Sequence, residues 1–248
     1  MNSIRQKTIR EFIELKQVTT IKEIQALYPD VSLMTIHRDL DALEKNGFIV
    51  KIRGGARAVR HTGDPGFDIR LQENNAGKMA MAQKALSLVA PGATIFLDAS
   101  TTNLVLARVM PDVNLNIFTT GPNIALELCK LHNPNITLCC GKLNRKTMAL
   151  SGQNTLEMLE KINIDLAFIG VSGCSAEAGF TCGTEGDMAV KAMVLRKART
   201  KVAMCDKGKF SRLMPYTFGQ FGDVDYFVTD DAPEQIIAQL KANDVKIL

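Results

Sequence analysis

The sequence lacks several features that would assign it to familiar classes of protein. None of its six cysteines belongs to a CxxC pair, and a chain of 248 residues is too long for six cysteines to act as a disulfide framework. Apolar runs reach only strand or short-helix length, well below the ~20 residues that a membrane-spanning helix needs. The first residues also lack the apolar stretch of a signal peptide. We therefore expect a cytoplasmic protein with no membrane partner.

Motifs of common catalytic and cofactor sites are absent as well. The sequence contains no Walker motif, no GxGxxG and no nucleophile elbow, and neither His61 nor His132 has a cysteine or carboxylate at metal-ligand spacing. Four cysteines lie among apolar or small residues, and we expect them to be buried and inert: Cys129, Cys174, Cys182 and Cys205. We expect no catalytic residue, no metal and no cofactor.

Positive charge is concentrated at the start of the chain. Residues 1–60 contain eleven Lys and Arg against seven Asp and Glu, whereas residues 61–248 contain nineteen of each kind. A basic module joined to a neutral body indicates contact with a polyanion. A chance distribution of charge would explain this asymmetry equally well. The residue pattern of the module therefore has to distinguish chance from binding to a polyanion.

Residues 1–60 have the pattern of a winged helix-turn-helix. Apolar spacing predicts one helix over about residues 3–16, a second from Ile21, and a third that follows the N-cap Ser32 and ends at Asn46-Gly47. The buried stripe of the third helix is Ile36, Leu40 and Leu43. Two β-runs then flank Gly54-Gly55, which predicts a basic hairpin, the wing.

In this motif the N-terminal residues of the last helix reach base edges in the major groove, and the wing contacts phosphate or the minor groove. Arginine can donate two hydrogen bonds to guanine, and hydroxyl groups can contact phosphates. We expect the DNA contacts to come from the third helix and the wing, at Ser32, Met34, Thr35, His37, Arg38, Lys51, Arg53, Gly54, Gly55 and Arg57.

Helices and strands alternate in the rest of the chain. Residues 61–75 lack a long apolar period and contain Gly and Pro, so we expect a linker there. Beyond it, strands are predicted at 94–97, 115–118, 136–139, 164–169, 201–205 and 225–228, with helical segments around them. This order favours an α/β domain with a mostly parallel sheet and helices on both faces.

Polar residues follow several of these strands, where ligands of open α/β sheets bind. Asp98 is followed by Ser100, Thr101 and Thr102 at a helix N-terminus, which suits an anion such as phosphate but also ordinary N-capping. The turn 206–209 carries a carboxylate and two lysines, and it fits either a phosphate and sugar site or a solvated turn.

A signature in the basic module is similar to that of a known family. The stretch from Val31 to Glu44, followed by Gly47 and Arg53-Gly54-Gly55-Ala56, resembles the signature of the DeoR family of bacterial transcriptional repressors. That signature has VS, TIRRDL and a Gly-Gly-Ala wing at this spacing. The C-terminal part resembles the family's sensor domain, a relative of ribose-5-phosphate isomerase and glucosamine-phosphate deaminase, so the resemblance covers essentially the whole chain.

The resemblance implies an effector pocket, usually for a phosphorylated sugar intermediate. The family's pocket motifs fall on Asp98, Ser100, Thr101, Thr102, Thr119, Thr120, Gly141, Lys142, Asp187, Lys191, Asp206 and Lys209. From spacing alone, Asp187 and Lys191 fit a surface ion pair on a helix equally well. The sequence departs from the family pattern at His37, Ser100, Thr120, Cys140 and Gly208, so the family alone does not identify the effector.

These observations predict a repressor of a carbohydrate-utilisation operon. A winged helix-turn-helix over 1–60 would bind operator DNA, and a ribose-5-phosphate-isomerase-like domain over 76–248 would bind a sugar phosphate. We expect a dimer or tetramer, because one helix-turn-helix reads too few bases for useful specificity. The alternative is a sugar-phosphate isomerase or deaminase with a DNA-binding appendix, in which Asp206, Asp187 or Glu185 acts as general base. Activation in place of repression stays open.

Overall fold

The computed structural model describes residues 2–16, 18–45, 48–58, 66–210 and 212–248. Contacts divide the chain into two compact units, residues 1–62 and 63–248. Within the described ranges, no helix combines the length and apolar character that crossing a membrane would require.

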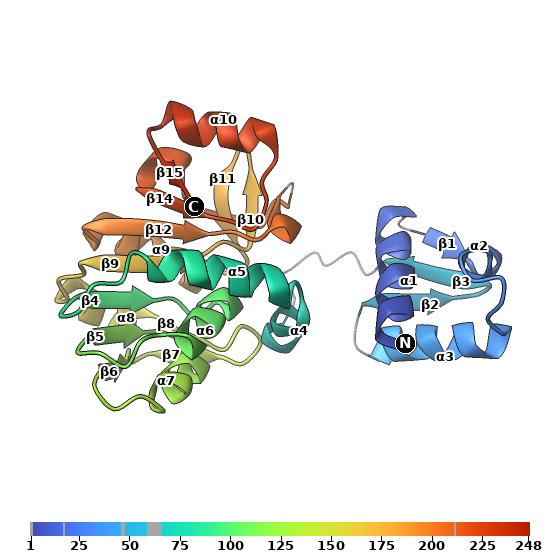
Figure 1. Cartoon of the computed structure of the whole chain (residues 1–248), viewed down its shortest axis with the longest axis horizontal. Helices are drawn as coiled ribbons and strands as arrows, with labels where there is room; N and C mark the ends of the chain where they lie inside the picture. The colour runs from blue at the N-terminus through green and yellow to red at the C-terminus, as the bar shows by residue number, and fades with distance from the viewer. Residues whose placement is uncertain (1, 17, 46–47, 59–65, 211) are drawn as a thin grey trace. The chain divides into compact units, whose positions relative to one another are not determined.

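The described residues of the first unit form three helices and a three-stranded antiparallel sheet (Figure 1). Its elements are α1 (Asn2–Lys16), β1 (Val18–Thr20), α2 (Ile21–Ala26), α3 (Leu33–Lys45), β2 (Ile49–Ile52) and β3 (Gly55–Ala58). The apolar residues whose spacing predicts the helices form one core, with Ile36, Leu40 and Leu43 of α3 inside it. The predicted helix-turn-helix and wing are confirmed, while the predicted helix end at 46–47 lies outside the described residues.

Strand β1 is not predicted by the sequence, and it explains the Gly-Gly pair of the wing. It pairs antiparallel with β3, which extends the hairpin into a three-stranded sheet. Gly54 has a φ of +81°, a backbone conformation that favours glycine. Gly55 lies opposite Thr20, and a Cβ on Gly55 would lie 2.0 Å from the carbonyl oxygen of Thr19. The first glycine therefore makes the turn, and the second allows β1 to approach.

The second unit is built on a seven-stranded parallel sheet with the order β15-β14-β12-β9-β4-β5-β6. The strands are β4 (Thr94–Leu97), β5 (Asn116–Thr119), β6 (Asn135–Leu138), β9 (Leu166–Gly170), β12 (Thr200–Met204), β14 (Tyr226–Val228) and β15 (Lys246–Ile247). The helices are α4 (Phe67–Gln72), α5 (Asn75–Leu86), α6 (Thr101–Arg108), α7 (Pro122–Leu128), α8 (Gln153–Glu160), α9 (Glu185–Lys197) and α10 (Glu234–Ala242). The predicted α/β sheet is confirmed.

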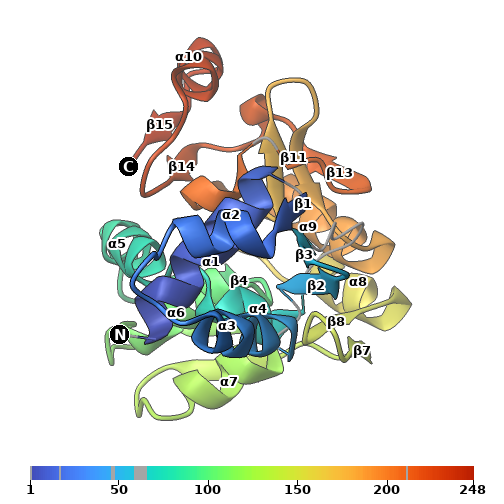
Figure 2. The same cartoon turned by 90° about the vertical axis from the view of Figure 1, so that its right-hand side faces the viewer.

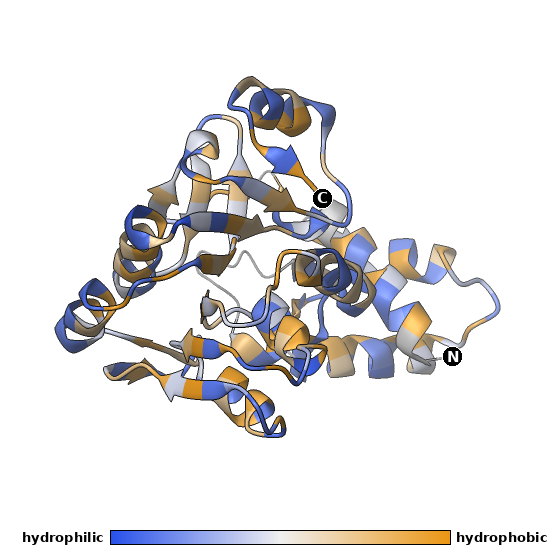
Figure 3. Ribbon diagram, turned by 60° about the vertical axis from the view of Figure 1, so that its left-hand side comes forward, coloured by the Kyte–Doolittle hydropathy of each residue, from blue (hydrophilic) through white to orange (hydrophobic). Residues whose placement is uncertain are grey.

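Helices cover both faces of this sheet, because its strands are apolar on both sides. In β9, Phe168 packs with residues of α5, α6 and α7, whereas its neighbours Ala167 and Ile169 pack with residues of α8, α9 and α10. Figure 2 shows α10 and α7 at opposite ends of the sheet. In Figure 3, α10 has hydrophobic residues on one side and hydrophilic residues on the other, as expected for a helix that covers a core.

Two small antiparallel sheets accompany the main one, and the sequence analysis predicts neither. They are β10 (Gly173–Ser175) with β11 (Gly179–Cys182) and β13 (Tyr216–Gly219), and the hairpin of β7 (Lys142–Asn144) and β8 (Ala149–Ser151). Two short 3-10 turns complete the unit, η1 (Lys207–Lys209) and η2 (Phe221–Asp223). Each of these five strands has only one or two apolar residues beside glycine or polar residues, so none shows the apolar run that marks a buried strand.

The linker predicted over 61–75 is wrong at its C-terminal end. Residues 67–72 form helix α4, and α5 already begins at Asn75. Phe67 and Arg70 of α4 are buried, so this segment belongs to the second unit. A six-residue helix with two buried side chains has no long apolar period, which is why the sequence pattern misses it. Residues 61–65 lie outside the described residues.

One expectation about the cysteines is also wrong. Cys129 is exposed at the C-terminal end of α7, whereas Cys174, Cys182 and Cys205 are buried as expected. Leu128 beside it points into the core, and on a helix the next residue is turned by about 100° from that direction.

Candidate functional site

The exposed face of α3 carries the predicted DNA contacts. Ser32 begins the helix, where its Oγ accepts a hydrogen bond from the Thr35 N–H at 3.3 Å. Met34 and Arg38 are exposed, and Thr35 and His37 are half-buried. Ile36 and Leu40 hold the opposite face in the core. The Arg38 guanidinium is thus in solvent on the helix face that can meet base edges.

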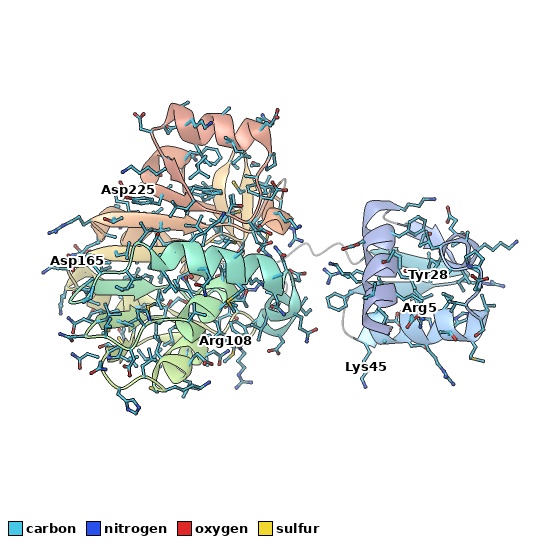
Figure 4. The ribbon with its side chains drawn as sticks, in the orientation of Figure 1. Arg5, Tyr28, Lys45, Arg108, Asp165 and Asp225 are labelled. Carbon is cyan, nitrogen blue, oxygen red and sulfur yellow. The ribbon has the colours of Figure 1, made fainter. Side chains whose placement is uncertain are left out.

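Buried Asp39 fixes how α3 sits against α1. Its carboxylate, 2% exposed as a residue, accepts hydrogen bonds from Arg5 Nε at 2.5 Å and Gln6 Nε2 at 2.9 Å. The hydrogen bond to Asp39 raises the pKa of Arg5. Figure 4 shows Arg5 between the two helices. The sequence analysis misses Asp39, because a carboxylate beside an exposed arginine carries no sign of burial.

The wing is attached to α3 by acidic side chains. Lys51 on β2 forms an ion pair with Asp41, and the Lys51 backbone N–H donates to Glu44 Oε1 at 2.7 Å. The hydrogen bond to Asp41 raises the pKa of Lys51. Arg53 and Arg57 are exposed on the hairpin. The structure therefore gives Lys51 a role in orienting the wing and leaves the two arginines in solvent.

In the second unit, Asp98 connects three elements at the carboxyl end of the sheet. Its Oδ1 accepts from the Ser100 N–H at 3.1 Å and from Asn103 Nδ2 at 2.8 Å. Its Oδ2 accepts from the Gly170 N–H at 2.9 Å and lies 3.3 Å from Lys191 Nζ. Asp98 is 1% exposed. Both of its oxygens are thus engaged in holding α6, β9 and α9 together.

Lys191 is the buried cation of this cluster. Its Nζ donates to the Gly170 carbonyl at 2.7 Å and lies 3.0 Å from Asp187 Oδ2. Burial opposes the charge, but Asp187 and Asp98 outweigh it and raise the pKa of Lys191. The alternative of a surface pair between Asp187 and Lys191 is wrong, because Lys191 is only 3% exposed.

A small cavity opens beside this cluster. It is lined by Arg70, Asp98, Ala99, Ser100, Thr147, Ala149, Asp187 and Lys191. Four residues predicted for the effector pocket therefore meet in one place: Asp98, Ser100, Asp187 and Lys191. The sequence analysis misses Arg70 and Thr147, which come from α4 and from the turn between β7 and β8. Nothing in the sequence distinguishes them from other polar residues of loops.

The predicted residues Asp206 and Lys209 form a neighbouring ion-pair cluster. Lys209 Nζ lies 3.4 Å from Glu73 Oε2 and 4.0 Å from Asp206 Oδ2. Asp206 also caps η1 by accepting from the Gly208 N–H at 3.0 Å. The alternative of a solvated turn is wrong, because both side chains are buried.

The other predicted pocket residues do not line the described cavity. They are Thr101, Thr102, Thr119, Thr120, Gly141 and Lys142. Thr101 and Thr102 are buried in the first turn of α6, and Thr119 at the end of β5 accepts from the Gly121 N–H at 3.0 Å. Lys142 is exposed on β7. Within the described ranges, no group of three or more His, Cys, Asp and Glu side chains could hold a metal ion.

Comparison with family models accounts for both units. Residues 5–62 match the DeoR-like helix-turn-helix domain, and residues 73–231 match the DeoR C terminal sensor domain. The chain belongs to the DeoR family. This DeoR-family protein is a DNA-binding transcriptional regulator with an N-terminal helix-turn-helix domain and a C-terminal sensor domain.

Curated relatives of this DeoR-family regulator cover nearly its whole length. It is 32% identical to the HTH-type transcriptional regulator GlpR of Haloferax volcanii, over 89% of this chain and 88% of the relative. It is 30% identical to the L-fucose operon activator of Escherichia coli, over 93% and 96%, and 31% identical to the HTH-type transcriptional repressor GlcR of Bacillus subtilis, over 97% and 93%. Among solved structures, ribose 5-phosphate isomerase A of Methanocaldococcus jannaschii matches 56% of this chain and 55% of its own, with 17% identity and a TM-score of 0.42.

Proposed function

We propose that this regulator represses a carbohydrate-utilisation operon and that a phosphorylated sugar, bound in the sensor domain, controls it. The cavity beside Asp98 and Lys191 carries the proposal. The cavity contains a helix N-terminus and two cations, which suit a phosphate group, together with carboxylates that suit sugar hydroxyls. One of the relatives is named for its action on the operon of a sugar, L-fucose, which supports a role in carbohydrate use.

We assign the DNA contacts to the exposed face of α3 and to the wing. The proposed residues are Ser32, Met34, Thr35, His37, Arg38, Lys51, Arg53, Gly54, Gly55 and Arg57. The exposure of Arg38, Arg53 and Arg57 supports this assignment. The remaining pocket residues of the family pattern, from Thr101 to Lys209, are proposed to contact the effector or to shape its site.

The regulator is proposed to act without catalysis, in the cytoplasm where operator DNA lies, as a dimer or tetramer. Two of the carboxylates that the enzyme alternative would use as general base are instead held in ion pairs, Asp187 with Lys191 at 3.0 Å and Asp206 with Lys209 at 4.0 Å. Sustained turnover of ribose 5-phosphate or of a hexosamine phosphate would contradict this part of the proposal. Light scattering of the purified protein measures the oligomer.

Thermal unfolding with a panel of sugar phosphates and the corresponding free sugars tests the effector. A ligand that binds only the native state stabilises it by about 2.7 kcal/mol at a hundredfold excess over Kd. We expect one phosphorylated sugar to raise Tm and its free sugar not to. No shift with any member of the panel would refute phosphorylated-sugar control. In a reporter strain, deletion of the gene should raise transcription of the target operon, because the repressor is then missing. A fall in transcription would instead show that the protein is an activator.

A further inference from the structure

Helix α4 is the first described element after residues 59–65, and it packs directly against the effector cavity. The Phe67 N–H donates to the Lys146 carbonyl at 2.8 Å, and the Phe67 side chain is buried in the core. Arg70 Nη2 donates to the Thr147 carbonyl at 3.3 Å. Both contacts join α4 to the turn between β7 and β8. In Figure 1, α4 lies near the carboxyl ends of the strands.

Two cavity-lining side chains from these segments point to a ligand. Thr147 is 5% exposed, and its buried Oγ1 has no hydrogen-bond partner among the residues that the structure describes. A buried hydroxyl without a partner is uncommon, and a bound ligand would satisfy it. Arg70 is also buried in the cavity wall, where its planar group of N–H donors has the geometry that phosphate requires. The positive charge of Lys191 is already balanced by ion pairs with Asp98 and Asp187.

The other end of α4 is held firmly. The buried ammonium of Lys78 on α5 donates to the carbonyl oxygens of Arg70 and Glu73. The Glu73 carboxylate in turn accepts from Lys209 after β12. The N-terminal end of α4 is held on the β7–β8 turn by Phe67 and by the bond from Arg70 to the Thr147 carbonyl, so a change at Arg70 acts on the attachment of this end. That end continues along the chain into residues 59–65 and the DNA-binding unit.

We propose that Arg70 and Thr147 bind the anionic group of the effector, and that α4, by carrying Arg70, transmits occupancy of the cavity toward the DNA-binding unit. This inference rests on the proposed control by a phosphorylated sugar. An effector that engages the Arg70 guanidinium competes with the Thr147 carbonyl for it. Effector binding is thereby linked to the position of α4. If α4 has one position with effector and another without, the difference in effector affinity between them determines the coupling free energy between effector and DNA binding.

The test uses the full-length protein and three variants. Arg70→Gln removes the cation, Thr147→Val removes the unpartnered hydroxyl at nearly constant volume, and Arg108→Gln is the control. Arg108 is an arginine on α6 whose side chain is 44% exposed and paired with Glu127. The probes are glucose 6-phosphate, fructose 1-phosphate, fructose 6-phosphate, glycerol 3-phosphate and inorganic phosphate. Operator DNA is selected from a random library with the wild-type protein.

Ligand affinity and operator affinity are measured separately. We expect Arg70→Gln and Thr147→Val each to weaken binding of the wild-type ligand about tenfold, with Arg108→Gln unchanged. Without ligand, all variants bind operator like the wild type. With ligand raised to saturation, the wild type and Arg108→Gln change operator affinity about tenfold, whereas Arg70→Gln does not. Circular dichroism checks the fold, and if Arg70→Gln does not fold, Arg70→Lys takes its place.

The outcomes separate this inference from the proposed function. A wild-type protein that binds none of the probes refutes both. A wild type that responds to a sugar phosphate, together with an Arg70→Gln variant that binds it and releases DNA equally well, refutes only the inference. Loss of affinity in Arg70→Gln with full release at saturation makes Arg70 a ligand contact alone, and refutes transmission through α4.

Discussion

Replacing Lys191 with methionine should destabilise the sensor domain strongly, since it removes a buried cation between two carboxylates. Breaking a buried ion pair by removing one partner costs about 3–5 kcal/mol of unfolding free energy. Asp98 is 1% exposed and would stay buried, whereas the Asp187 side chain is 17% exposed and can regain water. Asp98 also keeps its three N–H donors, from Ser100, Asn103 and Gly170. We therefore expect a loss near the lower bound, about 3 kcal/mol.

Urea unfolding followed by circular dichroism measures this loss. Because the chain has two units, the transition of the sensor domain is fitted separately from that of the DNA-binding unit. Lys130→Met is the matched control. Its ammonium pairs with Glu127 at 2.7 Å, but the Lys130 side chain is 69% exposed, and removal of such a pair costs no more than about 1 kcal/mol.

The slope of unfolding free energy against urea should be the same in both variants, since neither changes the surface exposed on unfolding. If Lys191→Met loses no more stability than Lys130→Met, the reasoning fails. The carboxylates of Asp98 and Asp187 would then be stabilised by something other than Lys191, and the cavity would not be a desolvated site.

Three further predictions concern other parts of the chain. Arg38→Ala should weaken operator binding by about 1–3 kcal/mol in a gel-shift titration, and unchanged affinity would exclude Arg38 from base readout. Gly55→Ala should cost about 1–3 kcal/mol in thermal unfolding, because the added Cβ meets the Thr19 carbonyl, and a neutral result would mean that β1 moves away freely. Burial lowers the pKa of Lys78 from 10.5 to about 8, so between these pH values only the unfolded chain stays protonated and the folded state gains up to about 3 kcal/mol as pH rises. Urea unfolding at pH 7.5 and 10 should show this gain in the wild type and not in Lys78→Met.

Elements with a long apolar period are the ones that the sequence predicts well. Ile36, Leu40 and Leu43 define the buried face of α3, and therefore also the exposed face that carries Arg38. Strand β1 has no such signal, because its three residues become a strand only through pairing with β3. Helix α4 also lacks such a signal, because its two buried residues, Phe67 and Arg70, are too few to form a pattern.

The candidate cavity is predictable only in part. Some of its residues follow a strand or have a helical spacing that the sequence shows, whereas others reach the cavity only through tertiary packing. Asp98 follows a strand of a parallel sheet, and the rule that ligands bind at carboxyl ends of strands places it correctly beside Ser100. Lys191 joins them from a helix, where its spacing from Asp187 fits a surface pair as well as a buried one. Arg70 and Thr147 reach the cavity only through the packing of α4 on the β7–β8 turn, which no local pattern encodes.

Ser100 shows how one departure from the family pattern affects the cavity. The family has glycine at this position, and here the Ser100 Oγ caps α6 by accepting from the Asn103 N–H at 3.1 Å. The Ser100 side chain also occupies the space beside Gly170, where a Cβ on Gly170 would lie 2.3 Å from the Ser100 Cβ. A side chain at position 100 therefore requires glycine at 170, and it fills volume in the wall of the cavity. Because the side chain that caps the helix also narrows the cavity, helix stability and cavity volume are linked at this residue.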